Sequence, residues 1–459
     1  MDGDYERFGR LDDSGRRETI YPARVSGVYS RRKLVIHSIL LLIYLVLPWL
    51  TINGMPVIWF DIPERYFAFF GMVFNAQDFY IFFFLLSGIG FLLIVASALW
   101  GRVWCGWACP QTVFLDGVFR RIEYWIEGSA VRRRRVDMGQ WNLKTYFKKM
   151  VKHFVFLVVC LILTHTFLAY FVPVSELMNM VIDDPRENVS VFLWMVFITL
   201  AIYLNFAWFR EQWCLVMCPY GRLQSALQDD DTVLIGYDEQ RGEPRGKARS
   251  ENTGDCVDCK RCVAVCTTGI DIRRGLQLEC LGCTQCIDAC NQIMFRLGRP
   301  PGLIRYDSLN GFEGRERRFF RPRVFFYLGA AILGLLVGGI MSLNVSPIDI
   351  HISRGQGTPF IIEEGQVRNK FLIRLVNKVN RDVPVRIESV SPESLNVIIP
   401  QARMNIGARS DQRLPVIISF VRERPILDTT IKLKFYVDQA KDPREFELTI
   451  LGPNIGGRG

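Results

Sequence analysis

The sequence predicts a multi-domain membrane protein with five transmembrane helices, a cysteine-rich α+β domain and a C-terminal β-sandwich. Three observations lead to this prediction. Five stretches are apolar enough to cross a bilayer, eight cysteines recur at regular intervals before the fifth stretch, and the segment 346–459 consists of short β-rich runs. With 50% hydrophobic residues, the chain is also too apolar for an ordinary soluble protein.

The apolar stretches are the predicted membrane spans. A helix needs about 20 apolar residues to cross the hydrocarbon core, where no water satisfies exposed backbone groups. The stretches that meet this requirement contain no Asp, Glu, Lys or Arg, and they are Leu34–Ile52, Phe79–Trp100, Phe154–Val174, Val189–Phe209 and Val324–Val345. We therefore expect a multi-pass protein in the lipid bilayer, with its fifth helix at 323–345.

The distribution of basic residues predicts the orientation of these spans. A tail at 1–33 and a loop at 111–153 are rich in Lys and Arg, whereas the loops after the first and third spans are nearly free of them. Because basic loops stay in the cytoplasm, we expect the N-terminus and the segment 220–322 inside the cell and the segment 346–459 in the periplasm. The run Arg132–Arg135 is then a topology signal that touches lipid phosphates, and no nucleic-acid partner is expected.

Two segments of the chain repeat one another. The first span begins K-L-V-I-H and the third begins K-M-V-K-H, which puts His37 and His153 at matching positions. The second and fourth spans run into W-C-G-W-A-C-P and W-C-L-V-M-C-P. The repeat predicts two homologous helical hairpins, 34–110 and 154–219, that run parallel about an axis along the membrane normal. Their cysteine-containing ends can then converge.

The cysteine block between the fourth and fifth spans is the most specific signal. Three cysteines at intervals of three residues, followed by a fourth, occur twice with 13 residues between the copies. In bacterial two-cluster ferredoxins this spacing lets the first three cysteines bind one 4Fe-4S cluster and the fourth bind the other. The segment 220–322 is therefore predicted to be a ferredoxin-like domain. One cluster takes Cys256, Cys259, Cys262 and Cys290, and the other takes Cys280, Cys283, Cys286 and Cys266.

Two features of this block bear on that interpretation. A pair of four-cysteine zinc sites is the alternative, although zinc sites need neither the third evenly spaced cysteine nor the crossed pairing. The usual ferredoxin motif has proline after each fourth cysteine, where this chain has Thr267 and Asn291. Because proline is not a ligand, we expect these changes to affect the rigidity or the potential of the site and not its existence.

Four more cysteines stand at the ends of the two hairpins. Each pair is spaced i, i+4, which places both thiols on one helix face if the helix continues, and a proline follows each pair. Such thiols suit a soft ion such as Cu(I) or a dithiol–disulfide cycle, and the simpler interpretation is a small buried side chain. His37 and His153 are candidate ligands for copper or heme, or only hydrogen-bonding groups. The cysteines are Cys105, Cys109, Cys214 and Cys218.

The segment 346–459 is predicted to be an immunoglobulin-like β-sandwich. Its β-rich runs alternate with turn residues about every ten positions, which is typical of such sandwiches. The predicted strands are Lys370–Val376, Val383–Val390, Leu395–Ile399, Leu414–Phe420, Thr430–Val437 and Glu445–Leu451.

The two Trp-Cys-x-x-x-Cys-Pro hairpins, the double cysteine motif with T-G-I-D-I-R (Thr268–Arg273), the fifth span and the β-domain together resemble the CcoG family, also called FixG or RdxA. The resemblance covers nearly the whole chain. It implies an accessory protein for assembly of the cbb-type cytochrome c oxidase, acting as a cupric reductase in the bacterial inner membrane. The family's paired membrane cysteines carry over to Cys105, Cys109, Cys214 and Cys218.

The resemblance also implies partners. An unidentified cytosolic donor would reduce the clusters, and Cu(I) would pass to a copper-exporting P-type ATPase or to assembly factors of the oxidase. A homodimer is compatible with the sequence. Two other functions stay open at this point: an electron relay from quinol to a reductase, as in the related NapH and NosR membrane proteins, and a copper-binding assembly scaffold without redox activity.

Overall fold

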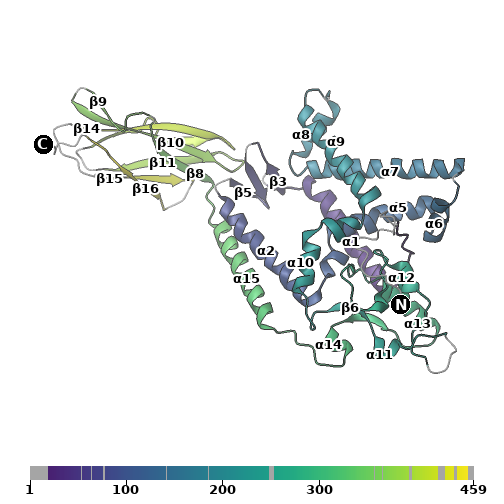
Figure 1. Cartoon of the computed structure of the whole chain (residues 1–459). Helices are drawn as coiled ribbons and strands as arrows, with labels where there is room; N and C mark the ends of the chain where they lie inside the picture. Colours follow the sequence, from purple (N-terminus) through teal and green to yellow (C-terminus); the bar gives the residue numbers. More distant parts are fainter. Residues whose placement is uncertain are drawn as a thin grey trace. The chain divides into compact units, whose positions relative to one another are not determined.

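The structure is a computed structural model of the whole chain (Figure 1). It describes residues 19–52, 54–63, 65–75, 78–140, 142–184, 186–247, 253–355, 357–363, 365–391, 395–421, 430–438 and 442–452. These residues form two compact units. The first unit comprises the described residues up to Trp49 together with Phe82–Gly339, and the second comprises Leu50–Ile81 and the described residues from Ile340 onward.

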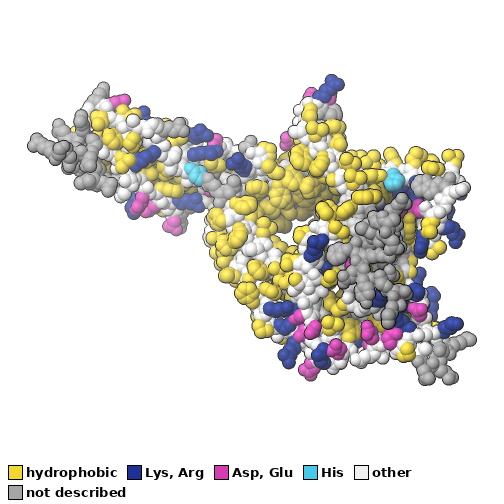
Figure 2. Space-filling model, in the orientation of Figure 1, with side chains coloured by type: hydrophobic (Ala, Val, Ile, Leu, Met, Phe, Trp, Pro, Cys, Tyr) yellow, Lys and Arg dark blue, Asp and Glu magenta, His cyan; other side chains and the backbone are white. Residues whose placement is uncertain are grey.

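Among the described residues, five helices are long and apolar enough to cross a membrane, in agreement with the prediction. Hydrophobic side chains cover the visible surface of two of these helices, α2 and α15, in Figure 2, and large apolar residues such as Phe83 and Leu333 are exposed there. Such a surface fits a lipid environment. The five helices are α1 (Val28–Val46), α2 (Phe79–Trp100), α7 (Leu143–Leu168), α9 (Val189–Leu204) and α15 (Pro322–Leu343).

Helix α1 begins at Val28, well before the predicted start at Leu34. The side chain of Asp288 accepts hydrogen bonds from the backbone N–H groups of Tyr29 (3.2 Å) and Ser30 (2.7 Å), which lie in the first turn of the helix. A carboxylate at this position satisfies unpaired amides and complements the helix dipole. Because Asp288 is distant in sequence, this earlier start could not be predicted locally.

Helix α7 also departs from the predicted span, Phe154–Val174. It begins at Leu143, where the Asn142 side chain caps it by accepting a hydrogen bond from the N–H of Thr145 (2.9 Å). It ends at Leu168. A turn follows, and Pro173, which cannot continue a helix, precedes the short helix α8 (Val174–Ile182).

Glycines bring α2 and α15 into close contact. A Cβ atom on Gly334 would lie 3.0 Å from the backbone of Gly88, and one on Gly338 would lie 2.8 Å from the Leu85 side chain. Gly334 and Gly338 are spaced as in the small-xxx-small motif, which lets two membrane helices approach closely.

Two strands close the cysteine-rich segment into an α+β domain. β6 (Leu234–Tyr237) precedes the cysteines, β7 (Ile304–Asp307) follows them, and the two pair antiparallel. The other helical segments of the first unit are η1 (Leu47–Trp49), α3 (Val103–Trp107), α4 (Pro110–Phe114), η3 (Leu115–Phe119), α5 (Arg120–Glu127), α6 (Ala130–Met138), η4 (Asn205–Phe209), η5 (Trp213–Met217), α10 (Pro219–Leu227), α11 (Glu239–Gly242), α12 (Arg261–Val265), η6 (Ile272–Arg274), α13 (Gln285–Arg296) and α14 (Leu309–Phe312).

The C-terminal part of the second unit is a sandwich of two antiparallel sheets. One sheet has the order β12-β14-β10-β8, with β9 also paired to β10, and the other has the order β13-β11-β15-β16. Alternate residues point into the core between them, as Ile431, Leu433 and Phe435 do on β15. The strands are β8 (Ile348–Arg354), β9 (Ile361–Glu363), β10 (Gln366–Asn377), β11 (Val383–Val390), β12 (Asn396–Ile398), β13 (Arg403–Ile406), β14 (Asp411–Val421), β15 (Thr430–Val437) and β16 (Arg444–Thr449).

The loop after the first span belongs to this same unit and forms strands that the sequence did not suggest. The Lys378 side chain, only 1% exposed, joins the loop to the sandwich, because its Nζ lies 2.8 Å from an Asp78 carboxylate oxygen and 2.8 Å from an Asp349 carboxylate oxygen. The loop and the sandwich therefore pack together within the second unit. The strands are β1 (Thr51–Ile52), β2 (Met55–Pro56), β3 (Ile58–Asp61), β4 (Tyr66–Phe69) and β5 (Met72–Asn75).

Candidate redox site

The eight cysteines of the regular block line two neighbouring cavities. The first cavity is lined by Cys256, Cys259, Cys262 and Cys290. The second is lined by Cys266, Cys280, Cys283 and Cys286, with Cys262 also on its wall. Each cavity thus gathers three cysteines of one copy of the motif and the fourth cysteine of the other copy, which is the crossed arrangement of a two-cluster ferredoxin.

The backbone repeats along with the motif. Lys260 and Thr284, each directly after the second cysteine of its copy, have φ of 51° and 65°. The residues directly before those cysteines, Asp258 and Gly282, also have positive φ, at 49° and 66°. Left-handed residues turn the chain sharply, so each loop curls around its cavity before α12 or α13 begins. Glycine occupies only one of these four positions.

The grouping of the thiols is that of a two-cluster site, because each set takes its fourth cysteine from the other copy of the motif. A zinc site needs four sulfurs about 2.3 Å from one point. The two sets of cysteines instead surround hollows. A 4Fe-4S cluster, which binds each thiolate to a different iron, suits four thiols placed around a hollow.

Burial raises the pKa of two thiols in these cavities, Cys280 and Cys290. Burial, followed by the neighbouring thiols, raises the pKa of Cys290 to about 12. Burial likewise raises the pKa of Cys280 to about 12, where neighbouring Cys283 and Cys266 add to the effect. Cysteine binds metal as thiolate, so cluster binding must displace these protons.

The two residues that stand in place of the ferredoxin prolines have different tasks. Thr267 donates a hydrogen bond from its hydroxyl to the Cys283 sulfur at 3.8 Å. Such a bond stabilises negative charge on a ligand sulfur and thereby raises the reduction potential of a cluster held there. Asn291 instead accepts a hydrogen bond from the N–H of Gly302 at 2.9 Å, and so holds the chain that leads to β7.

The cysteines at the ends of the two hairpins, called the membrane-edge cysteines below, lie in or directly beside short helical segments beyond the spans. They are Cys105, Cys109, Cys214 and Cys218. A left-handed residue ends each span, Gly101 after α2 and Arg210 after η4, both with φ of 52°. Cys105 follows on α3 and Cys214 on η5, while Cys109 and Cys218 are the extended residues that precede the prolines beginning α4 and α10. The prolines therefore start new helices, and neither pair lies on a continuous helix face.

The ends of the two hairpins lie close enough together for their thiols to affect one another's pKa. Burial and then the neighbouring Cys109 raise the pKa of Cys105 to about 12, and the same two causes act on Cys214, also to about 12. Cys218 contributes to both. The Cys105 thiol donates a hydrogen bond to the buried side-chain oxygen of Gln224 on α10 at 3.2 Å. Gln224 is a site residue that the sequence motifs did not reveal.

Helix α3 touches one of the two cysteine loops directly. A Cβ atom on Gly106 would lie 2.4 Å from the carbonyl oxygen of Gly282, so only glycine allows this approach. Nearby, Trp107 donates a hydrogen bond from Nε1 to the hydroxyl of Tyr306 (3.1 Å), which donates to the same carbonyl (3.3 Å). The segment between Cys105 and Cys109 is thus in continuous contact with the loop that contains Cys283.

Among the described residues, the two predicted histidine ligands, His37 and His153, do not form a ligand group with the thiols. His153 shares a hydrogen bond of 2.8 Å between its Nδ1 and the hydroxyl of Tyr203. His37 is 2% exposed on α1. Neither forms a single-ion ligand group with two further His, Cys, Asp or Glu side chains among the described residues. Cys160, deeper in α7, is buried in a hydrophobic cluster. His165, also on α7, makes a hydrogen bond of 2.8 Å between its Nδ1 and the carbonyl oxygen of Leu161.

Buried ion pairs hold the loop after α2 in place. Although burial alone would raise it, the pKa of Asp116 lies well below its usual range because Lys33 and Arg120 pair with this carboxylate. Arg133, from the basic run that we interpreted as a topology signal alone, makes a buried ion pair of 2.6 Å with Glu123. That interpretation was incomplete for Arg133, since a carboxylate of the same loop neutralises it.

Three family models match the chain. A model described as a 4Fe-4S dicluster domain matches residues 209–309, which contain all eight cysteines of the two cavities. One described as a 4Fe-4S binding domain matches residues 81–136, which contain Cys105 and Cys109. One described as an IG-like fold at the C-terminal of FixG matches residues 339–453.

The relatives extend this likeness to most of the chain. The chain is 31% identical over 453 residues to nitrogen fixation protein FixG of Rhizobium meliloti, covering 87% of this chain and 86% of that protein. It is 36% identical over 394 residues to protein RdxA of Cereibacter sphaeroides, covering 81% and 82%. A solved structure of a FixG-related protein from Vibrio parahaemolyticus matches 24% of this chain and 98% of its own at 14% identity, with a TM-score of 0.20.

Proposed function

The chain belongs to the FixG and RdxA family of iron–sulfur electron-transfer proteins, and on this premise we propose that it reduces Cu(II) to Cu(I) at the membrane-edge thiols. The observation that carries the proposal is the contact of Gly106 with Gly282, because it places the helix of Cys105 against a cysteine loop. The proposed copper site consists of Cys105, Cys109, Cys214 and Cys218.

In this proposal the two groups of cysteines have different roles. The eight cysteines of the two cavities would hold the clusters, in the crossed sets described above, and each bound cluster would supply one electron at a time. The four membrane-edge thiols would bind copper and favour Cu(I), because thiolates prefer the softer ion and so raise the potential of the copper couple. Gln224 orients the Cys105 sulfur through its hydrogen bond, and copper binding would release the thiol protons.

The same proposal includes the direction of the protein in the membrane. The basic tail, the basic loop and the ferredoxin-like domain would face the cytoplasm of a bacterium, since basic segments stay inside. The second unit would then face the periplasm across the inner membrane. A cytosolic donor would reduce the clusters, and Cu(I) would leave toward a copper-exporting P-type ATPase or the assembly factors of a cbb-type oxidase.

A single-turnover experiment tests this function. Protein purified anaerobically is reduced, freed of reductant and mixed with Cu(II). We expect about two Cu(I) per chain, because two clusters give one electron each, together with recovery of the oxidised cluster absorbance. Cu(I) is measured with a chelator specific for that ion. Reduced clusters that persist beside unreacted Cu(II) would refute the proposal and favour electron transfer to another acceptor, whereas Cu(I) binding without reduction would favour a scaffold.

A further inference from the structure

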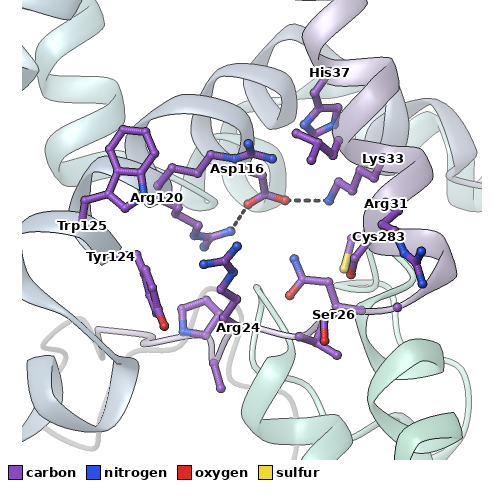
Figure 3. Close-up of a pocket in the computed structure, with 18 of the residues that line it drawn as sticks. Arg24, Ser26, Arg31, Lys33, His37, Asp116, Arg120, Tyr124, Trp125 and Cys283 are labelled. Atoms are coloured by element: carbon purple, nitrogen blue, oxygen red, sulfur yellow. Dashed lines mark hydrogen bonds and ion pairs between the residues drawn. The ribbon is translucent and has the colours of Figure 1, made fainter.

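A cavity of about 310 Å³ in the first unit has no part in the function proposed above. It lies between the start of α1, helices α5 and α6, and the loop of Cys283 (Figure 3). Its volume is at the lower end of the range typical of small-molecule sites. The chemistry of its wall indicates what it holds.

The wall carries an excess of positive charge. Six cationic side chains line the cavity, namely Arg24, Arg31, Lys33, Arg120, Arg121 and Arg133, and Asp116 is the acidic residue on the wall. Ion pairs with Asp116 or Glu123 neutralise Lys33, Arg120 and Arg133. Within the described residues, no carboxylate pairs with Arg24, Arg31 or Arg121. Among the described residues, three guanidinium groups on this wall are thus without a carboxylate partner.

Two of these groups, Arg24 and Arg121, line the same cavity and repel one another. Burial and then the charge of Arg24 lower the pKa of Arg121, while the Asp116 carboxylate acts in the opposite direction. Arg24 also lies over the Tyr124 ring, 5.0 Å from its centroid, which fixes its position. A phosphate between the two guanidinium groups would turn this repulsion into attraction.

A buried nitrogen on the same wall lacks a partner. His37 is only 2% exposed, and its Nε2 has no hydrogen-bond partner among the described residues. Figure 3 shows the His37 side chain beside the Lys33–Asp116 pair. An unpaired buried polar atom is costly, so an oxygen-bearing occupant would stabilise this site.

The place of the cavity selects among anions. α1 is one of the helices that are long and apolar enough to cross a membrane, and Trp125 on α5 lines the cavity while 77% exposed, as expected of an aromatic residue at a membrane interface. Basic pockets between helices at this level bind lipid head groups. We infer that the cavity binds the phosphate of an anionic phospholipid, with Arg24 and Arg121 contacting the phosphate oxygens.

Lipid titration of the cluster-containing protein in detergent tests this inference. Native mass spectrometry counts bound phosphatidylglycerol, with phosphatidylcholine as the uncharged comparison. The double variant Arg24→Gln, Arg121→Gln should bind phosphatidylglycerol at least about tenfold more weakly, because charge-assisted hydrogen bonds are lost. Arg134→Gln is the matched control, since Arg134 is exposed on α6 and outside the cavity wall. It should bind like the wild type.

Further measurements distinguish a lipid phosphate from a soluble phosphate, and loss of charge from misfolding. Arg24→Lys with Arg121→Lys keeps both charges and should restore much of the binding, which separates loss of charge from misfolding. Equal binding of the two lipids, or unchanged binding in the double glutamine variant, would overturn the inference. Complete displacement of phosphatidylglycerol by millimolar inorganic phosphate would identify a soluble phosphate as the occupant and overturn the assignment to lipid.

Discussion

Replacing Cys105 and Cys109 together with alanine should abolish Cu(II) reduction while both clusters stay in place. The two thiols belong to the proposed copper site and lie outside both cluster cavities. Without them, half of the soft ligands that favour Cu(I) are gone. We expect the rate of Cu(I) formation to fall to that of the uncatalysed reaction, with an unchanged iron content and an unchanged electron paramagnetic resonance spectrum of the reduced protein.

Cys160→Ala is the matched control for this experiment. Cys160 is also a buried cysteine of the first unit, but it lies within α7 and packs against apolar side chains. Its removal should leave Cu(II) reduction close to that of the wild type. Full activity in the Cys105 and Cys109 double variant would mean that copper takes electrons elsewhere. Loss of clusters in that variant would mean that the pair has a structural role and would also contradict the account.

Replacing Lys378 with methionine should destabilise the second unit by about 3–5 kcal/mol, because the largely buried carboxylates of Asp78 and Asp349 would lose the buried cation that they share. Lys378 is 1% exposed and bridges Asp78 and Asp349. Hydrogen exchange measured by mass spectrometry on the full-length protein reports the effect locally. We expect faster exchange in β8 and β10 and in the loop before α2, with no change in the cysteine-rich domain.

Arg381→Met is the comparison for this variant. Arg381 pairs with Asp438 at 2.6 Å, but its side chain is 59% exposed, and such pairs contribute about 0–1 kcal/mol. Adding Asp78→Asn and Asp349→Asn to Lys378→Met should recover much of the lost protection, because it removes the unpaired charges. Normal exchange in Lys378→Met alone would show that the buried triad does not hold the loop to the sandwich.

The cysteine block could be assigned from sequence because its information is local. Regular spacing alone paired Cys290 with the first set and Cys266 with the second, and the two cavities group the side chains in the same way. The spans and the strands β11 and β15 were likewise predictable, since apolar runs of a given length and period leave few alternatives. The family resemblance rested on the order of these features and is confirmed by relatives over most of the chain.

The remaining features depend on contacts between residues far apart in sequence. Asp288 sets the start of α1 from the cysteine-rich domain, and Gln224 reaches Cys105 from α10, which follows the second hairpin. The sequence motif did not explain why residue 106 is glycine, whereas the structure does, because only glycine allows the close approach to Gly282. The strands β1 to β5 are short and acquire stability by packing on a neighbouring domain, which no local propensity encodes.

The central claim is that eight cysteines hold two clusters while four others stay available for copper. Iron and acid-labile sulfide analysis of the anaerobically purified protein tests it most directly. The account predicts about eight iron atoms per chain, four in each cluster, with electron paramagnetic resonance of the reduced protein accounting for two clusters. Zinc in place of iron would contradict the cluster assignment. About twelve iron atoms would contradict the copper site, because a third cluster would then occupy Cys105, Cys109, Cys214 and Cys218.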